Sequence, residues 1–204
     1  MSNAYWDFTY AGQVYAFLMA TIQNDYGVSG LLGNIYAESY ICPFICETDS
    51  PPCTESYNVT MNQLRSMSSY DFQHYHLPSA APSKVGYSLA QWTTYGRKDN
   101  YYNFCGQSLL GDGQKSMEFL LYELQNSYSN VYNVLVNATS INQASDYVLQ
   151  WYEAPQSWQS QIYTRRQYSQ NVYDDFSGGP PPANPLPKWL IAYAANQARL
   201  RGTR

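Results

Sequence analysis

Apolar residues recur at helical spacing along most of the chain. Val14, Leu18 and Ile22 follow one another at intervals of four and predict a helix over residues 9–24, which Gly27 is expected to end. The same periodicity predicts a second helix after it and further helices near 60–70, 97–105, 113–127, 130–137, 141–153 and 159–176. We therefore expect a mainly helical fold.

Polar residues and a proline mark the expected helix ends. Ser29 can cap the second helix, and Ser140 with Gln143 forms a capping box for the helix at 141–153. Pro155 is expected to stop that helix, because proline lacks the N–H group that a helix interior requires.

One stretch departs from the helical period. Residues 86–92 indicate a short extended or hairpin segment that closes at 93–96, and loops are expected at 42–60 and up to Ser83. The predicted fold class is thus mainly α, or α+β with a helical bundle and one small hairpin.

Composition divides the chain near its C-terminal end. Residues 1–176 are expected to form one domain, and residues 177–187 form a linker rich in glycine and proline. Residues 188–204 hold four basic groups and no acidic one, which predicts a short basic amphipathic segment that docks on a partner protein. The sequence shows no signal peptide and no apolar run of the roughly 18 residues that span a bilayer, so we expect no stable membrane insertion.

Charge and composition limit the class of molecule that the protein can bind. Only 13% of residues are charged and the net charge is −4, so no field suited to nucleic acid is available. A polar, weakly charged surface with 22 tyrosines suits a neutral, hydroxylated partner such as a glycan, although a compositional habit of the source would look the same.

Three of the four cysteines, Cys42, Cys46 and Cys53, lie within twelve residues, and Cys105 lies apart. We expect a loop pinned by one or two disulfides, most simply between Cys46 and Cys53. The spacing is too wide for a zinc site, and we predict no metal and no cofactor. The nearby pair at residues 74–76, His74 and His76, keeps metal binding as an alternative.

One carboxylate continues an apolar helix face. Leu31, Ile35 and Glu38 lie at positions i, i+4 and i+7. Burial and the negative end of a helix both favour a protonated carboxyl group, as a general acid requires. The alternative is a partly buried glutamate that hydrogen-bonds a neighbouring loop.

Other acidic residues suggest structural roles. Asp71 and Asp112 stand where helix capping is the ordinary interpretation. Glu153 is expected to form a salt bridge with Arg165 or Arg166 one helix later.

Six segments follow one another along the chain: LGNIYAES at 32–39, GYSLAQWT at 86–93, GRK at 96–98, MEFLLYEL at 117–124, ASDYVLQWYEAP at 144–155 and Arg165-Arg166. In this order they resemble the motifs of the phage tail lysozyme family, which belongs to the lysozyme superfamily. The likeness covers roughly residues 10–176.

This resemblance implies a lysozyme-like domain that hydrolyses the β-1,4 bond between N-acetylmuramic acid and N-acetylglucosamine in peptidoglycan, acting from a virion tail outside the cell. Glu38 would be the proton donor, on a helix facing a cleft. The small hairpin would form one wall of the cleft. Its substrate-binding residues would be Tyr87, Ser88, Gln91, Trp92 and Thr93, with the two rings stacking on sugars or holding the wall in place.

One departure from the family pattern concerns the second carboxylate. Residues 83–88 contain no acid where animal lysozymes have an aspartate, and Ser88 stands where the family usually has glycine. Either Glu47, Asp49 or Asp99 activates water, or Glu38 acts alone as in a lytic transglycosylase. A glycan-binding or structural tail component is the non-enzymatic alternative.

Overall fold

The first predicted helix is present as α1 (Phe8–Ile22), and its apolar positions Val14, Leu18 and Ile22 are buried. It belongs to a computed structural model that describes residues 8–43, 45, 65–74 and 85–178. The other helices are α2 (Asp25–Ser39), α4 (Ser69–His74), α5 (Tyr95–Cys105), α6 (Gly113–Asn126), α7 (Ser129–Val136), α8 (Ile141–Val148) and α9 (Trp158–Phe176), with a 3₁₀ turn at Gln107–Leu109 and a π-helical turn at Leu149–Glu153.

The mainly α class is confirmed, and no strand occurs in the part of the chain that the structure describes. The expected hairpin is reduced there to a single antiparallel bridge between Tyr87 and Trp92. The linker beyond residue 178, the segment 188–204 and most of the helix expected near 60–70 lie outside the described residues.

The expected boundary between the first two helices was wrong. Gln23 takes a left-handed φ of 56° and ends α1, and the Asn24 side chain then caps α2 by accepting a hydrogen bond from the Gly27 nitrogen at 3.0 Å. Gly27 and Ser29 therefore lie inside α2. A glycine that follows an apolar run signals a helix end only when no helix packs against it, which sequence spacing does not show.

Two further expectations need correction. Residues 71–74 were expected in a loop but belong to α4, which Ser68 begins by accepting a hydrogen bond from the Asp71 nitrogen at 3.1 Å. Ser140 caps α8 as predicted, but Gln143 reaches Thr139 and not Ser140, so the capping box is only half formed.

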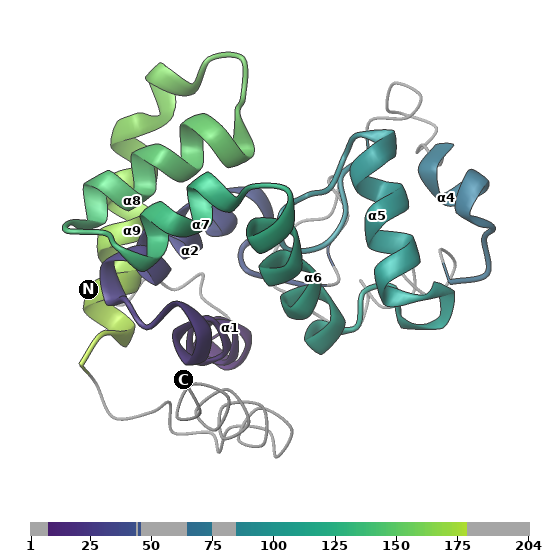
Figure 1. The fold of residues 1–204 in the computed structure, drawn as a ribbon, viewed down its shortest axis with the longest axis horizontal. Helices are drawn as coiled ribbons and strands as arrows, with labels where there is room; N and C mark the ends of the chain where they lie inside the picture. The colour runs from purple at the N-terminus through teal and green to yellow at the C-terminus, as the bar shows by residue number, and fades with distance from the viewer. Residues whose placement is uncertain (1–7, 44, 46–64, 75–84, 179–204) are drawn as a thin grey trace. The chain divides into compact units, whose positions relative to one another are not determined.

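Contacts divide the chain into two units, and Figure 1 labels their helices. The first unit combines residues 1–37 with the chain from residue 124 onwards. In it α8 packs along α9, and the fully buried apolar residues include Leu31, Leu135 and Val172.

The second unit spans residues 38–123 and has a largely aromatic core. Trp92 stacks on Tyr101 at a centroid distance of 4.6 Å and meets Phe119 edge-on at 4.8 Å. Phe72 of α4 stacks on Tyr87 at 4.8 Å, which ties α4 to the turn at residues 86–93. Part of the unusual tyrosine content is thus core.

Candidate active site

The helix that carries Glu38 approaches three other helices so closely that glycine is required at three positions. A Cβ atom at Gly27 would lie 2.0 Å from a backbone oxygen of α7, and one at Gly30 would lie 2.4 Å from a side-chain carbon of α8. At Gly33 it would lie 2.3 Å from the backbone nitrogen of Ser169 in α9. Contacts this short fix the position of α2 against its neighbours.

A buried polar network holds the same helix face. The Asn34 amide donates to the backbone oxygens of Gly30 and Ser145, at 2.9 and 3.0 Å. Arg165 Nη1 donates to the Asn34 carbonyl oxygen at 2.8 Å, and the Ser169 hydroxyl donates to Ser145 Oγ at 3.0 Å. Since all four polar residues are buried, each is expensive to leave unpaired, and together they specify one arrangement of α2, α8 and α9.

The two arginines of the predicted pair have different partners. Arg165 serves α2 as described, whereas Arg166 forms an ion pair with Asp146 of α8. The expected salt bridge of Glu153 with Arg165 or Arg166 stays a prediction, and the partner shown for Arg166 is Asp146. Asp146 lies one helical turn before the π-helical segment, and the sequence did not single it out.

Glu38 lies in the last turn of α2 and is half-buried. The two residues that follow Ser39 are strained, because Tyr40 and Ile41 have φ values of 55° and 59° without being glycine. Such strain costs of the order of 1–3 kcal/mol per residue and is commonest at functional sites. The backbone at this helix end is therefore held in an unusual path immediately after the candidate acid.

The segment at residues 86–93 forms a tight turn closed by the bridge between Tyr87 and Trp92. Ser88 and Gln91 take φ values of 64° and 43°, in the region that favours glycine. A glycine would adopt this conformation at position 88 without strain. Here the buried Ser88 hydroxyl donates to Ser116 Oγ at 2.9 Å, which partly offsets the strain.

A buried ion pair supports the turn at residues 86–93. Trp92 Nε1 donates to Glu123 at 2.9 Å, and Arg97 donates to both oxygens of the same carboxylate at 2.8 Å. The carboxyl side chain is only 2% exposed. Three of the resembling segments thus meet at Glu123, a residue for which no separate role was predicted.

The turn residues expected to bind sugar lie together, but most face inward. Tyr87, Ser88 and Trp92 are fully buried, and Gln91 is 9% exposed, with its amide donating to the Ser88 carbonyl at 2.9 Å. Thr93 is half-buried and donates to the Gln91 carbonyl at 2.6 Å. In this structure the two rings have no face open to a sugar, so they hold the turn in place.

Three of the other acids named above have structural partners among the described residues. Asp112 caps α6 as expected by accepting a hydrogen bond from the Lys115 nitrogen at 2.9 Å. Asp71 lies inside α4, where its carboxylate accepts a hydrogen bond from the capping residue Ser68 at 2.7 Å. Asp99 accepts hydrogen bonds from Ser69 at 2.9 Å and from Gln73 at 2.8 Å, which joins α5 to α4. Glu47 and Asp49 lie outside the described residues.

The two cysteines that the structure describes are in different states. Cys42 is disulfide-bonded, which the expected pairing did not include, while Cys46 and Cys53 lie outside the described residues. Cys105 is a free thiol, and burial raises its pKa to about 12. Among the residues that the structure describes, no group of three histidines, cysteines or carboxylates could hold a metal ion, and His76 is not among them.

These features define a mainly helical, lysozyme-like protein. The sequence model of the phage tail lysozymes matches residues 9–176 of 204, and the chain belongs to this family, which confirms the resemblance. No curated protein and no solved structure matches the chain. Family membership implies peptidoglycan-lytic activity in general and fits a virion tail acting on the cell wall. No described helix combines the length and apolar character that crossing a bilayer requires.

Proposed function

We propose that the protein cleaves the β-1,4 bond between N-acetylmuramic acid and N-acetylglucosamine, with Glu38 as the general acid, from a phage tail. The observation that carries this proposal is the placement of a half-buried glutamate at the end of a helix held by glycine contacts and a buried polar network. A general acid needs this fixed position, because proton transfer depends on hydrogen-bond geometry to the leaving oxygen.

In the proposed reaction the Glu38 carboxyl group donates its proton to the glycosidic oxygen as the bond from C1 to that oxygen breaks. Positive charge develops on the sugar ring, and water adds to C1. The proton that this water loses goes to a carboxylate, either Glu38 in its ionised form or a second acid. Asp99 is a poor candidate for the second acid because it already accepts two hydrogen bonds from α4.

The turn at residues 86–93 would present its backbone groups and Thr93 to the glycan. Tyr87, Ser88, Gln91 and Trp92 would act on substrate indirectly, by fixing the turn. This division rests on their burial, since a fully buried ring cannot stack on a sugar without opening the core.

The second candidate activity is that of a lytic transglycosylase with the same acid. It is favoured by the engagement of Asp99 and by the lack of an acidic residue at 83–88. There the muramic 6-hydroxyl replaces water, so the product ends in an anhydro sugar and no water is consumed.

One experiment separates these activities. Peptidoglycan is incubated with the protein, and the released muropeptides are analysed by mass spectrometry. Reducing ends indicate a hydrolase, anhydro ends a transglycosylase, and no release indicates a binding or structural component of the tail. Glu38→Gln should abolish release, while the control Glu118→Gln, half-buried on α6 beside Lys115, should leave it unchanged. Removing a general acid costs roughly 10²–10⁴ in rate.

A further inference from the structure

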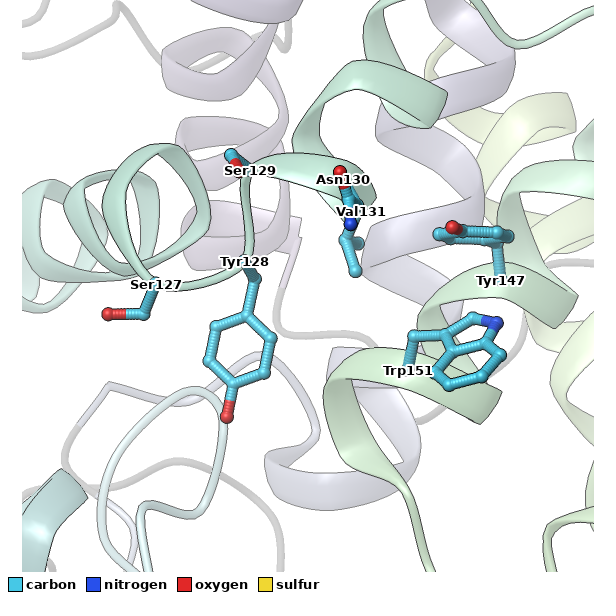
Figure 2. A pocket seen from close by; sticks show the side chains of 7 residues that line it. All are labelled: Ser127, Tyr128, Ser129, Asn130, Val131, Tyr147 and Trp151. Carbon is cyan, nitrogen blue, oxygen red and sulfur yellow. The ribbon is translucent and has the colours of Figure 1, made fainter.

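A pocket of about 290 Å³ lies in the first unit, between the start of α7 and the π-helical turn after α8. Three aromatic residues, Tyr128, Tyr147 and Trp151, line it. In Figure 2 the rings of Tyr147 and Trp151 lie next to each other, with Tyr128 on the other side of the pocket. Its size is near the lower end of ligand pockets, which span about 300–1,000 Å³.

The π-helical turn explains why a tryptophan is presented here. Within Leu149–Glu153, Leu149 and Tyr152 are buried, whereas Trp151 is 54% exposed. Tyr152 meets Tyr128 edge-on at 4.9 Å, so the exposed ring rests on a turn that is fixed from inside. Single π-helical turns are rare and frequently occur at functional sites.

The polar part of the pocket is neutral. Ser127, Ser129 and Asn130 contribute hydroxyl and amide groups, and none of the seven lining residues carries a charge. The first N–H groups of α7 have no partner within the helix. The side chain of the N-cap residue Tyr128 does not accept a hydrogen bond from them either. An uncharged pocket of this kind does not favour a phosphate or the charged ends of a peptide.

We propose that this pocket is an accessory carbohydrate site that holds one N-acetylated sugar ring of the wall glycan. A pyranose ring has a face of C–H groups that packs on an aromatic ring, and hydroxyl groups at its rim that exchange hydrogen bonds with serine and asparagine. Its acetamido carbonyl is an acceptor for N–H donors. The identity of the sugar rests on the proposed function, whereas the existence of the site rests on the pocket alone.

The test uses the full chain carrying Glu38→Gln, so that the probe is not cleaved. The probe is the β-1,4-linked trimer of N-acetylglucosamine. Binding is followed by calorimetry and by the NMR signal of the Trp151 indole N–H group. That signal is one of five, and it is assigned by its loss in Trp151→Ala. We expect saturable binding that shifts this signal and a dissociation constant at least about tenfold weaker in Trp151→Ala.

Tyr163→Ala is the matched control, because Tyr163 is 75% exposed and lies outside the pocket lining. It should leave the dissociation constant within about twofold of the parent. Equal affinity in the parent and Trp151→Ala, or binding that leaves the Trp151 signal unshifted, would overturn the accessory site. With an intact Glu38, Trp151→Ala should require more peptidoglycan for half-maximal rate and keep the maximal rate. A wild-type protein that releases no muropeptides refutes the proposed function independently of these results.

Discussion

Gly33→Ala tests whether the close approach of α2 to α9 positions the catalytic helix. The added Cβ would lie 2.3 Å from the backbone nitrogen of Ser169 and 2.2 Å from its Oγ, whereas ordinary contacts begin at 3.4 Å. The two helices must therefore separate by about 1 Å or distort. Overpacking costs roughly 1–3 kcal/mol. We expect the upper part of that range, because the Cβ added on the backbone of α2 meets backbone atoms of α9.

The expected effects are measurable in stability and in rate. A loss of about 3 kcal/mol lowers the melting temperature by roughly 6–12 °C in a domain of this size. Since α2 carries Glu38, a displacement of about 1 Å should lower the rate of peptidoglycan cleavage by up to about 10²-fold. Melting is followed by circular dichroism and cleavage by release of soluble muropeptides.

Gly96→Ala is the matched control. Nothing lies within 4 Å of a Cβ at Gly96, which belongs to α5, so alanine there should stabilise the protein by up to about 1 kcal/mol. Equal stability changes in the two variants would refute the argument. So would full rescue of Gly33→Ala by Ser169→Gly, because the backbone nitrogen of residue 169 remains in place.

Five other outcomes follow from the described contacts and the domain boundary. Glu123→Gln should cost about 3 kcal/mol in a denaturant titration, near the lower end for a broken buried ion pair, whereas Glu118→Gln, in a partly exposed pair with Lys115, should cost less than about 1 kcal/mol. Ser88→Ala should be less stable than Ser88→Gly, since both variants lose the hydroxyl hydrogen bond but only alanine keeps the left-handed strain; the reverse order would contradict a φ of 64°. The pKa of Cys105 is raised to about 12 from an ordinary 9.0, so its thiol should resist alkylation at pH 8 until the protein unfolds, and peptide mass spectrometry should detect this. Because the folded pKa is the higher one, the stability that this thiol contributes is complete below about pH 9 and is lost as the pH rises to about 12, and Cys105→Ala should weaken that alkaline loss in melting temperature. Removing residues 178–204 should leave muropeptide release nearly unchanged, and an unfolded product would place those residues in the core.

The helical pattern of apolar residues predicted most of the helices. Long segments such as 113–127 and 159–176 match α6 and α9 within about a residue. The mistakes cluster where one residue type serves two purposes. Gly27 resembles a helix stop, but it is a contact point for α7, and only the partner helix distinguishes these roles. The short helix α4 lacks a full turn of apolar repeats, and it is held by Phe72 and by hydrogen bonds to Asp99.

The candidate site was predictable as a set of segments but not as a set of orientations. Tyrosine and tryptophan serve equally well as core and as sugar platforms, because both have a large apolar ring and one polar atom. Trp92 is buried with its N–H on Glu123, while Trp151 is half exposed on a π-helical turn. Nothing in the local sequence separates these two cases, since burial depends on segments distant in the chain.

The resembling segments therefore carry two kinds of information. Asn34, Trp92, Glu123 and Arg165 are buried or nearly buried polar groups that satisfy one another or the backbone, and their loss would disturb the fold before it disturbed any chemistry. A sequence match built on such residues identifies the scaffold with high specificity, but a non-catalytic relative would need the same residues to fold. Glu38 differs from them, because it is half-buried in the last turn of α2, where glutamine would keep its volume and remove its titratable proton. Stability retained and muropeptide release lost in Glu38→Gln would therefore assign it to chemistry, whereas loss of both would place it with the scaffold.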